Sequence, residues 1–265
     1  MKAGKLVRAA AAMLVSASAV VLPAGMAPAW GQRPVGAQPR AETGPGPADP
    51  RLRCMSYDLQ VPTTPAPPTS APALKRHLDL LAEAERLRAP GAVEVVAIGD
   101  SIVQGWPPDL LRQAAGTDRV LNLGIGGDRF QHVLWRLQPA KWAMLQPRRV
   151  ILLLGTNNLG AGDKPCAMAA GAEAVLTRLR VLWPEAAITA VPVMPRGEAG
   201  GFRAADRAAF NALFGDMLAR IPHAAPVAGL EALADRPEDF VPDRLHLSRA
   251  GYEALTAAVA AAPRP

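Results

Sequence analysis

The sequence has little that would serve a metal centre, a nucleotide site or a nucleic-acid surface. It holds only two cysteines among 265 residues, and neither lies in a nucleophile or metal-binding motif. The P-loop lysine and the glycine spacing of a dinucleotide site are both missing. Arginines are scattered, with only Arg148 and Arg149 adjacent, so the net charge of +6 is typical of a solvated surface. We therefore expect no cofactor, no metal ion and no nucleic-acid partner.

Long hydrophobic runs are absent beyond the first residues. Lys2, Lys5 and Arg8 precede an apolar run over residues 9–22, and the small-residue pattern Ala27-Pro28-Ala29 follows it. Because the run is short for a bilayer span, residues 1–29 predict a cleaved secretory signal rather than a membrane anchor. The exported product, which keeps a net charge of about +3 without those three cations, is expected to be periplasmic or extracellular and not inserted in a membrane.

Residues 30–72 are rich in proline, alanine, glycine and threonine. Such a segment buries too little apolar surface to order itself, which predicts a disordered linker or tail, with residues 54–57 packed locally. Cys54 lies in this segment and Cys166 lies far along the chain. In an oxidising compartment they either form a disulfide or remain two free thiols, because their separation in the sequence does not give the distance between them in the fold. The remaining residues, 73–265, suffice for one full core and predict a single catalytic domain.

From residue 73 onward, short apolar runs alternate with helical stretches. The runs predict strands over 93–98, 120–123, 150–154 and 187–193, with a weaker fifth over 226–230. Helical spacing predicts helices over 73–87, 108–115, 129–137, 166–182, 203–220 and 248–261. This alternation favours an α/β fold with a parallel sheet covered on both faces. In such a sheet the active site forms at the carboxyl ends of the strands.

Three motifs follow the first three predicted strands. They are Gly99-Asp100-Ser101, the glycine-rich stretch 124–128, and the stretch 155–158, which reads Gly-Thr-Asn-Asn. Each motif also has another interpretation: the first as a helix cap, the second as a phosphate-binding loop and the third as a turn. Their shared position after parallel strands places Ser101, Gly127 and Asn157 at one edge of the sheet.

Two further polar patterns complete the set. Asp128 stands three residues before Gln131, which predicts a capping box for the following helix. Near the C-terminus, Asp243 stands three residues before His246, so the carboxylate can meet the imidazole if the turn brings them together. None of the other histidines, at positions 77, 132 and 223, has a carboxylate at that spacing.

In this order, the motifs resemble those of the SGNH (GDSL-like) hydrolases. Residues 96–251 are closest to the catalytic subunits of the intracellular type I platelet-activating-factor acetylhydrolases. That likeness rests on the segments 121–128, 132–137, 155–158, 195–197 and 245–248. The resemblance implies a flavodoxin-like three-layer α/β/α sandwich with a five-stranded parallel sheet.

The resemblance also implies the roles of the site residues. Ser101 corresponds to the nucleophile, His246 to the general base and Asp243 to the acid that orients it. The oxyanion hole corresponds to the N–H groups of Ser101 and Gly127 and the side chain of Asn157, with Asn158 in support. The chemistry agrees, because a serine hydroxyl needs a base to take its proton and that base needs a fixed tautomer.

The residues beside the catalytic groups, Ile102, Thr156 and Leu245, predict a narrow acyl pocket and an acetyl group as the preferred acyl group. The chain is accordingly interpreted as an exported serine esterase acting on a small-molecule or polysaccharide-linked ester. A lipase or arylesterase of broad acyl tolerance, an acyl transferase or deacetylase acting on envelope polysaccharide, and a non-catalytic glycan-binding module are the alternatives. A homodimer is suggested by analogy alone.

Overall fold

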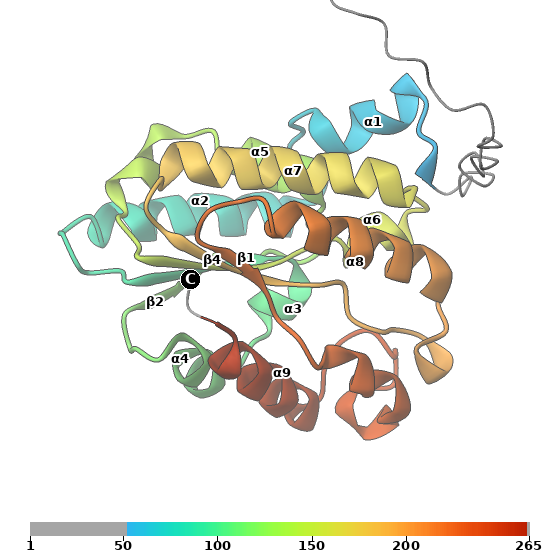
Figure 1. Ribbon diagram of the computed structural model, residues 1–265. Coiled ribbons are helices and arrows are strands. Elements are labelled where there is room, and N and C mark those ends of the chain that lie inside the picture. The colour runs from blue at the N-terminus through green and yellow to red at the C-terminus, as the bar shows by residue number, and fades with distance from the viewer. Residues whose placement is uncertain (1–51, 264–265) are drawn as a thin grey trace, which may run out of the picture. The chain divides into compact units, whose positions relative to one another are not determined.

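The computed structural model describes residues 52–263 (Figure 1). The predicted signal, residues 1–29, and the first part of the predicted linker lie outside the described residues and stay predictions. Between residues 52 and 263, no helix is both long and apolar enough to cross a membrane.

The described chain is built around a five-stranded sheet in the order β2-β1-β3-β4-β5. All neighbouring strands run parallel; Val95, for example, pairs with Val120 on one side and Arg149 on the other. Continuous burial along β1 and β3 is typical of parallel strands covered on both faces. The strand bounds are Val95–Gly99 (β1), Val120–Asn122 (β2), Arg149–Leu153 (β3), Ala187–Val191 (β4) and Ala224–Pro226 (β5).

Helices cover both faces of this sheet (Figure 1). One layer consists of α2 (Ala71–Arg86), α5 (Phe130–Arg136), α7 (Pro165–Leu182) and α8 (Ala204–Leu218). The other contains α3 (Ser101–Gln104), α4 (Pro108–Ala115) and α9 (Arg249–Ala261). Along β1, Val96 and Ile98 face the first layer while Val95 and Ala97 face the second, as the two-residue period of a strand requires. The predicted three-layer α/β/α fold is confirmed.

Most predicted elements match the structure within two residues, but the fifth strand does not. The sequence predicts it over 226–230, whereas β5 ends at Pro226. The apolar residues that suggested a strand lead instead into a turn, because Gly229 has a positive φ of 85° and a 3-10 helix (η4, Leu230–Asp235) follows it. The short helix α6 (Thr156–Gly160) and the other 3-10 helices, η2 (Ala140–Met144), η3 (Glu198–Gly200) and η5 (Pro237–Asp239), were not predicted either.

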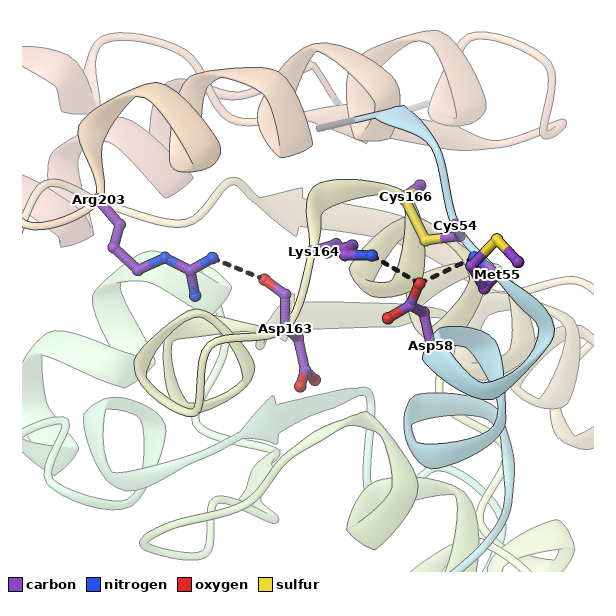
Figure 2. The surroundings of a disulfide bond; sticks show 7 residues. All are labelled: Cys54, Met55, Asp58, Asp163, Lys164, Cys166 and Arg203. Carbon is purple, nitrogen blue, oxygen red and sulfur yellow. Dashed lines mark hydrogen bonds and ion pairs between the residues drawn. A yellow bond between two sulfur atoms is a disulfide. The ribbon is translucent and has the colours of Figure 1, made fainter. Parts of the chain in front are cut away.

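Residues 52–72 are ordered, so the prediction of a disordered linker is wrong for this part of the segment. It contains the helix α1 (Ser56–Thr63), which packs on α7 and buries Pro62. Asp58 accepts a hydrogen bond from Lys164 Nζ at 2.8 Å. A disulfide joins Cys54 to Cys166 in the first turn of α7 (Figure 2). The segment is ordered by packing against the rest of the domain, and its own amino-acid composition does not predict such contacts.

Loss of the disulfide is expected to destabilise the fold. The bond closes a loop of 112 residues and restricts the unfolded chain, so replacing Cys54 and Cys166 together by Ser should lower the free energy of unfolding by about 2–4 kcal/mol. Urea unfolding of both proteins measures the difference. Lys164→Met, which removes the neighbouring ion pair with Asp58 and the cation–π contact with Tyr57 but leaves the disulfide in place, is the control and should shift the midpoint less. Equal midpoints for the double serine variant and the parent would contradict the expectation.

His77 on α2 should make stability depend on pH. Its side chain is 3 % exposed, and its ring lies 5.1 Å from that of Trp135. Burial lowers the pKa of His77 from 6.5 to about 4, with Arg136 adding to the effect. The folded state therefore favours the neutral ring of His77. The contribution of His77 to the free energy of unfolding is complete above pH 6.5 and is lost as the pH falls toward 4.

The comparison with His77→Phe isolates this effect. Between pH 6.5 and 4 the parent should lose up to about 3 kcal/mol more unfolding free energy than the variant. Urea unfolding at several pH values measures both. Parallel curves for the two proteins would show that His77 does not titrate differently in the folded state.

Candidate active site

Ser101 lies at the carboxyl end of β1, where the chain passes directly into the short helix α3. Asp100 caps this helix, with its Oδ1 accepting a hydrogen bond from the Ile102 N–H at 2.9 Å. Complete burial raises the pKa of Asp100 to about 7, against the effect of that hydrogen bond. The strand order reverses between β1 and β3, so Ser101 stands at the position where parallel α/β sheets form their binding crevices.

Gly99 is required by close packing in addition to the turn. A Cβ at this position would lie 2.1 Å from the Leu153 carbonyl oxygen of β3 and 2.4 Å from a methyl group of Val103. Any larger residue would push β1 away from β3 and move the following serine.

His246 and Asp243 meet Ser101 from the loop before α9. His246 Nε2 lies 2.9 Å from Ser101 Oγ, and His246 Nδ1 lies 2.6 Å from Asp243 Oδ2. The other Asp243 oxygen accepts the N–H groups of Leu245 and His246, each at 2.9 Å. Desolvation raises the pKa of Asp243, but these hydrogen bonds outweigh it and hold the pKa at about 2. The ionised carboxylate thus accepts Nδ1–H, which leaves Nε2 to accept the serine proton.

The histidine loop is open to solvent on its outer side. The side chains of Asp243 and His246 are 48 % and 40 % exposed. The loop is held from behind, since the Gly197 N–H donates to the Arg244 carbonyl at 2.8 Å. Arg244 itself has a positive φ of 54°, as the tight turn between the carboxylate and the imidazole demands.

Gly127 and Asn157 present hydrogen-bond donors at the same edge. Gly127 has a positive φ of 80°, and a Cβ built on it would meet nothing within 4 Å, so the space before it is open. Neither its N–H nor that of Ser101 donates to a protein group among residues 52–263. Asn157 Nδ2 donates to the Asp128 carbonyl at 2.9 Å, which uses one of its two N–H bonds. The structure therefore gathers all three predicted donors.

The three residues predicted to form the acyl pocket, Ile102, Thr156 and Leu245, line one small cavity. Its volume is about 10 Å³, close to the room that one water molecule needs. Sequence reasoning missed the remaining lining residues, which come from β3 and the loop after β4: Leu153, Leu154, Val193, Met194, Pro195 and Arg196.

A family model for the GDSL-like lipase/acylhydrolase family matches residues 97–254, which include every residue of this site. The chain belongs to that family. It is 32% identical over 164 residues to the platelet-activating factor acetylhydrolase IB subunit alpha1 of Rattus norvegicus, covering 60% of this chain and 70% of that one. Identity to the alpha2 subunit of the same species is 34% over 106 residues, 40% of this chain and 45% of that one.

Solved structures agree with this assignment. A structure described as a platelet activating factor from Streptococcus pneumonia is 25% identical, with a TM-score of 0.58 over 71% of this chain and 92% of that one. The structure of TesA is also 25% identical, with a TM-score of 0.53 over 63% of this chain and 95% of that one. The chain is therefore a GDSL hydrolase that acts on ester bonds.

The prediction that Asp128 and Gln131 form a capping box is wrong for this hydrolase. The helix α5 begins one residue later than that box requires, and the Arg129 N–H is bonded to His132 Nδ1 at 3.3 Å. The Asp128 carboxylate turns inward instead, 2.5 Å from Nη2 of the buried Arg136. Burial raises the pKa of Asp128 to about 6, and Arg136 opposes this. The pair anchors the loop that carries Gly127.

Asn158 supports the site of the hydrolase from inside the protein. It is fully buried, accepts the Phe130 N–H at 3.0 Å and donates to Asp163 Oδ2 at 2.7 Å. Its amide thereby links the helix α6, which carries Asn157, to the start of α5. Over residues 52–263, no group of three or more His, Cys, Asp or Glu side chains is placed to hold a metal ion.

Proposed function

We propose that this hydrolase is an exported serine esterase that removes short, acetyl-type acyl groups. Ser101 acts as the nucleophile, His246 as the general base and Asp243 as the group that orients the base. The observation that carries the proposal is the continuous hydrogen-bonded line from Asp243 through His246 to Ser101 beside a cavity of about 10 Å³.

The reaction follows from this geometry in two halves. As Ser101 Oγ bonds to the ester carbonyl carbon, His246 Nε2 takes the hydroxyl proton and the carbonyl oxygen becomes negative. Collapse of this intermediate breaks the bond to the alcohol, which leaves with the proton from His246. Water then repeats the sequence on the acyl-enzyme, releasing the carboxylic acid and free Ser101.

The negative oxygen is stabilised by donors that are already in place. They are the N–H groups of Ser101 and Gly127 and the second N–H of the Asn157 amide. The bond from Asn157 to the Asp128 carbonyl fixes the amide orientation before substrate arrives, so little reorganisation is needed in the transition state.

The narrow cavity predicts a steep dependence on acyl length. A methyl group fits a space of about one water molecule, and a longer chain needs the buried walls to move. We expect kcat/KM for p-nitrophenyl acetate to exceed that for the octanoate by about 100-fold or more. The acetylhydrolase names of the curated relatives support the same preference. Faster hydrolysis of the octanoate would reject the short-acyl pocket.

The alcohol side of the ester faces fewer constraints. Because about half of the Asp243 side chain is exposed, a large alcohol such as a polysaccharide can approach the loop. This observation favours a polysaccharide deacetylase as a second candidate. Measuring acetate release from an acetylated polysaccharide and from p-nitrophenyl acetate tests this candidate. Release from p-nitrophenyl acetate without release from the polysaccharide would restrict the substrate to small esters.

Export is proposed on two grounds. The first 29 residues have the pattern of a secretory signal, and the Cys54–Cys166 disulfide is of a kind that persists in oxidising compartments. Fusion of residues 1–72 to a reporter enzyme that is active only after export should give activity in a bacterial host. A fusion that stays inactive although it is produced would contradict export.

A further inference from the structure

The acyl pocket contains one charged side chain among its lining residues. Arg196 follows β4, and the other walls are apolar apart from Thr156. Leu153, the last residue of β3, and Val193, two residues beyond β4, are 3 % and 4 % exposed, so they belong to the core. Arg196 and Leu245 are the two lining residues that are only partly buried, and both come from loops, so they lie between the pocket and the outside.

Contacts with three residues hold the guanidinium of Arg196 in place. Its Nη1 donates to the Thr156 carbonyl at 3.0 Å and to the Thr156 hydroxyl at 3.2 Å. Its Cζ lies 4.6 Å from the ring centroid of Phe202, within the range of a cation–π contact. Nη1 also packs on Gly160, where a Cβ would lie only 3.2 Å away. The side chain is thus fixed between α6 and the loop after β4.

The backbone next to Arg196 is fixed as well. The N–H of the following residue, Gly197, donates to the carbonyl of Arg244 in the histidine loop. Arg196, together with the neighbouring Gly197, therefore connects the loop that carries His246 to the helix α6, which carries Asn157. A wall attached at both ends cannot swing aside for a longer acyl chain, as a mobile surface arginine could.

We propose that Arg196 is a specificity-determining residue that sets the upper limit of acyl length by closing the acyl pocket toward the outside. The inference rests on the proposed esterase activity. Removing the side chain leaves a space that joins the cavity of about 10 Å³, while the core walls and the hydrogen bonds of Ser101 stay as they are. The enlarged pocket then accepts longer acyl groups.

The test compares kcat/KM for p-nitrophenyl acetate, butyrate and hexanoate in the full chain. In Arg196→Ala we expect the ratio of butyrate to acetate to rise by about 10-fold or more, the scale on which a hydrophobic pocket discriminates added methylenes. Arg203→Ala is the matched control. Arg203 donates to the Leu159 and Asp163 carbonyls nearby but does not line the pocket, so its variant should keep the ratio of the parent.

A second variant guards against misfolding. Arg196→Gln keeps a donor for the Thr156 carbonyl but is shorter, and the ratio should shift in the same direction. If the parent hydrolyses the acetate and both variants keep its ratio of kcat/KM for butyrate to acetate, the proposed role of Arg196 is overturned while the proposed esterase function stands. A folded parent without any esterase activity would overturn both this inference and the proposed function.

Discussion

Replacing Ser101 by Ala should lower kcat for p-nitrophenyl acetate by about 10⁴-fold or more. The loss is large because His246 Nε2 has Ser101 Oγ as its partner at 2.9 Å, and the variant removes the atom that forms the acyl-enzyme. Residual activity would come from the oxyanion donors and from binding alone. Initial rates of purified parent and variant, with folding checked by circular dichroism, give the measurement.

Ser70→Ala is the matched control for that experiment. Ser70 caps α2 by accepting the Ala73 N–H at 3.3 Å and lies outside the acyl pocket and the triad. Its loss should lower the unfolding free energy by about 1 kcal/mol and leave kcat unchanged. If the Ser101 variant kept more than a tenth of the parental kcat, a nucleophile other than Ser101 would have to be sought.

Asn157→Ala should lower kcat by about 10²–10³-fold with little change in KM. The Asn157 amide stabilises charge that exists only in the transition state, so its loss should not weaken substrate binding. Asn157→Asp provides the sharper contrast, because it keeps the shape but turns an oxygen toward the developing negative charge. It should be at least as slow as the alanine variant. A loss confined to KM would place Asn157 in substrate binding instead.

The sequence predicted the sheet and one edge of the site for a physical reason. Strands buried on both faces must be continuously apolar, so the polar and glycine-rich motifs around Ser101, Gly127 and Asn157 stand out where those strands end. The position of these three motifs after parallel strands predicts one common edge without any family resemblance. The pairing of Asp243 and His246 with Ser101 spans more than a hundred residues, and only the family resemblance brought them together.

What the sequence did not reveal depends on partners far along the chain. Asp128 has the spacing of a helix cap, but the buried Arg136 draws its carboxylate inward. Residues 52–72 have the composition of a linker, but α7 and the disulfide to Cys166 order them. Arg196 looks like a surface residue until the fold brings Thr156 beside it. In each case a tertiary contact determines the position of the side chain or the order of the segment, and the local sequence pattern gives no sign of that contact.

Covalent trapping is the sharpest test of Ser101 as the nucleophile. The full chain is incubated with a p-nitrophenyl dialkyl phosphate, which phosphorylates activated serines, and its peptides are analysed by mass spectrometry. The proposed role of Ser101 predicts one adduct, on Ser101, that forms in proportion to the loss of esterase activity and is absent from the His246→Ala variant. An adduct on another residue, or full loss of activity without modification of Ser101, would contradict it.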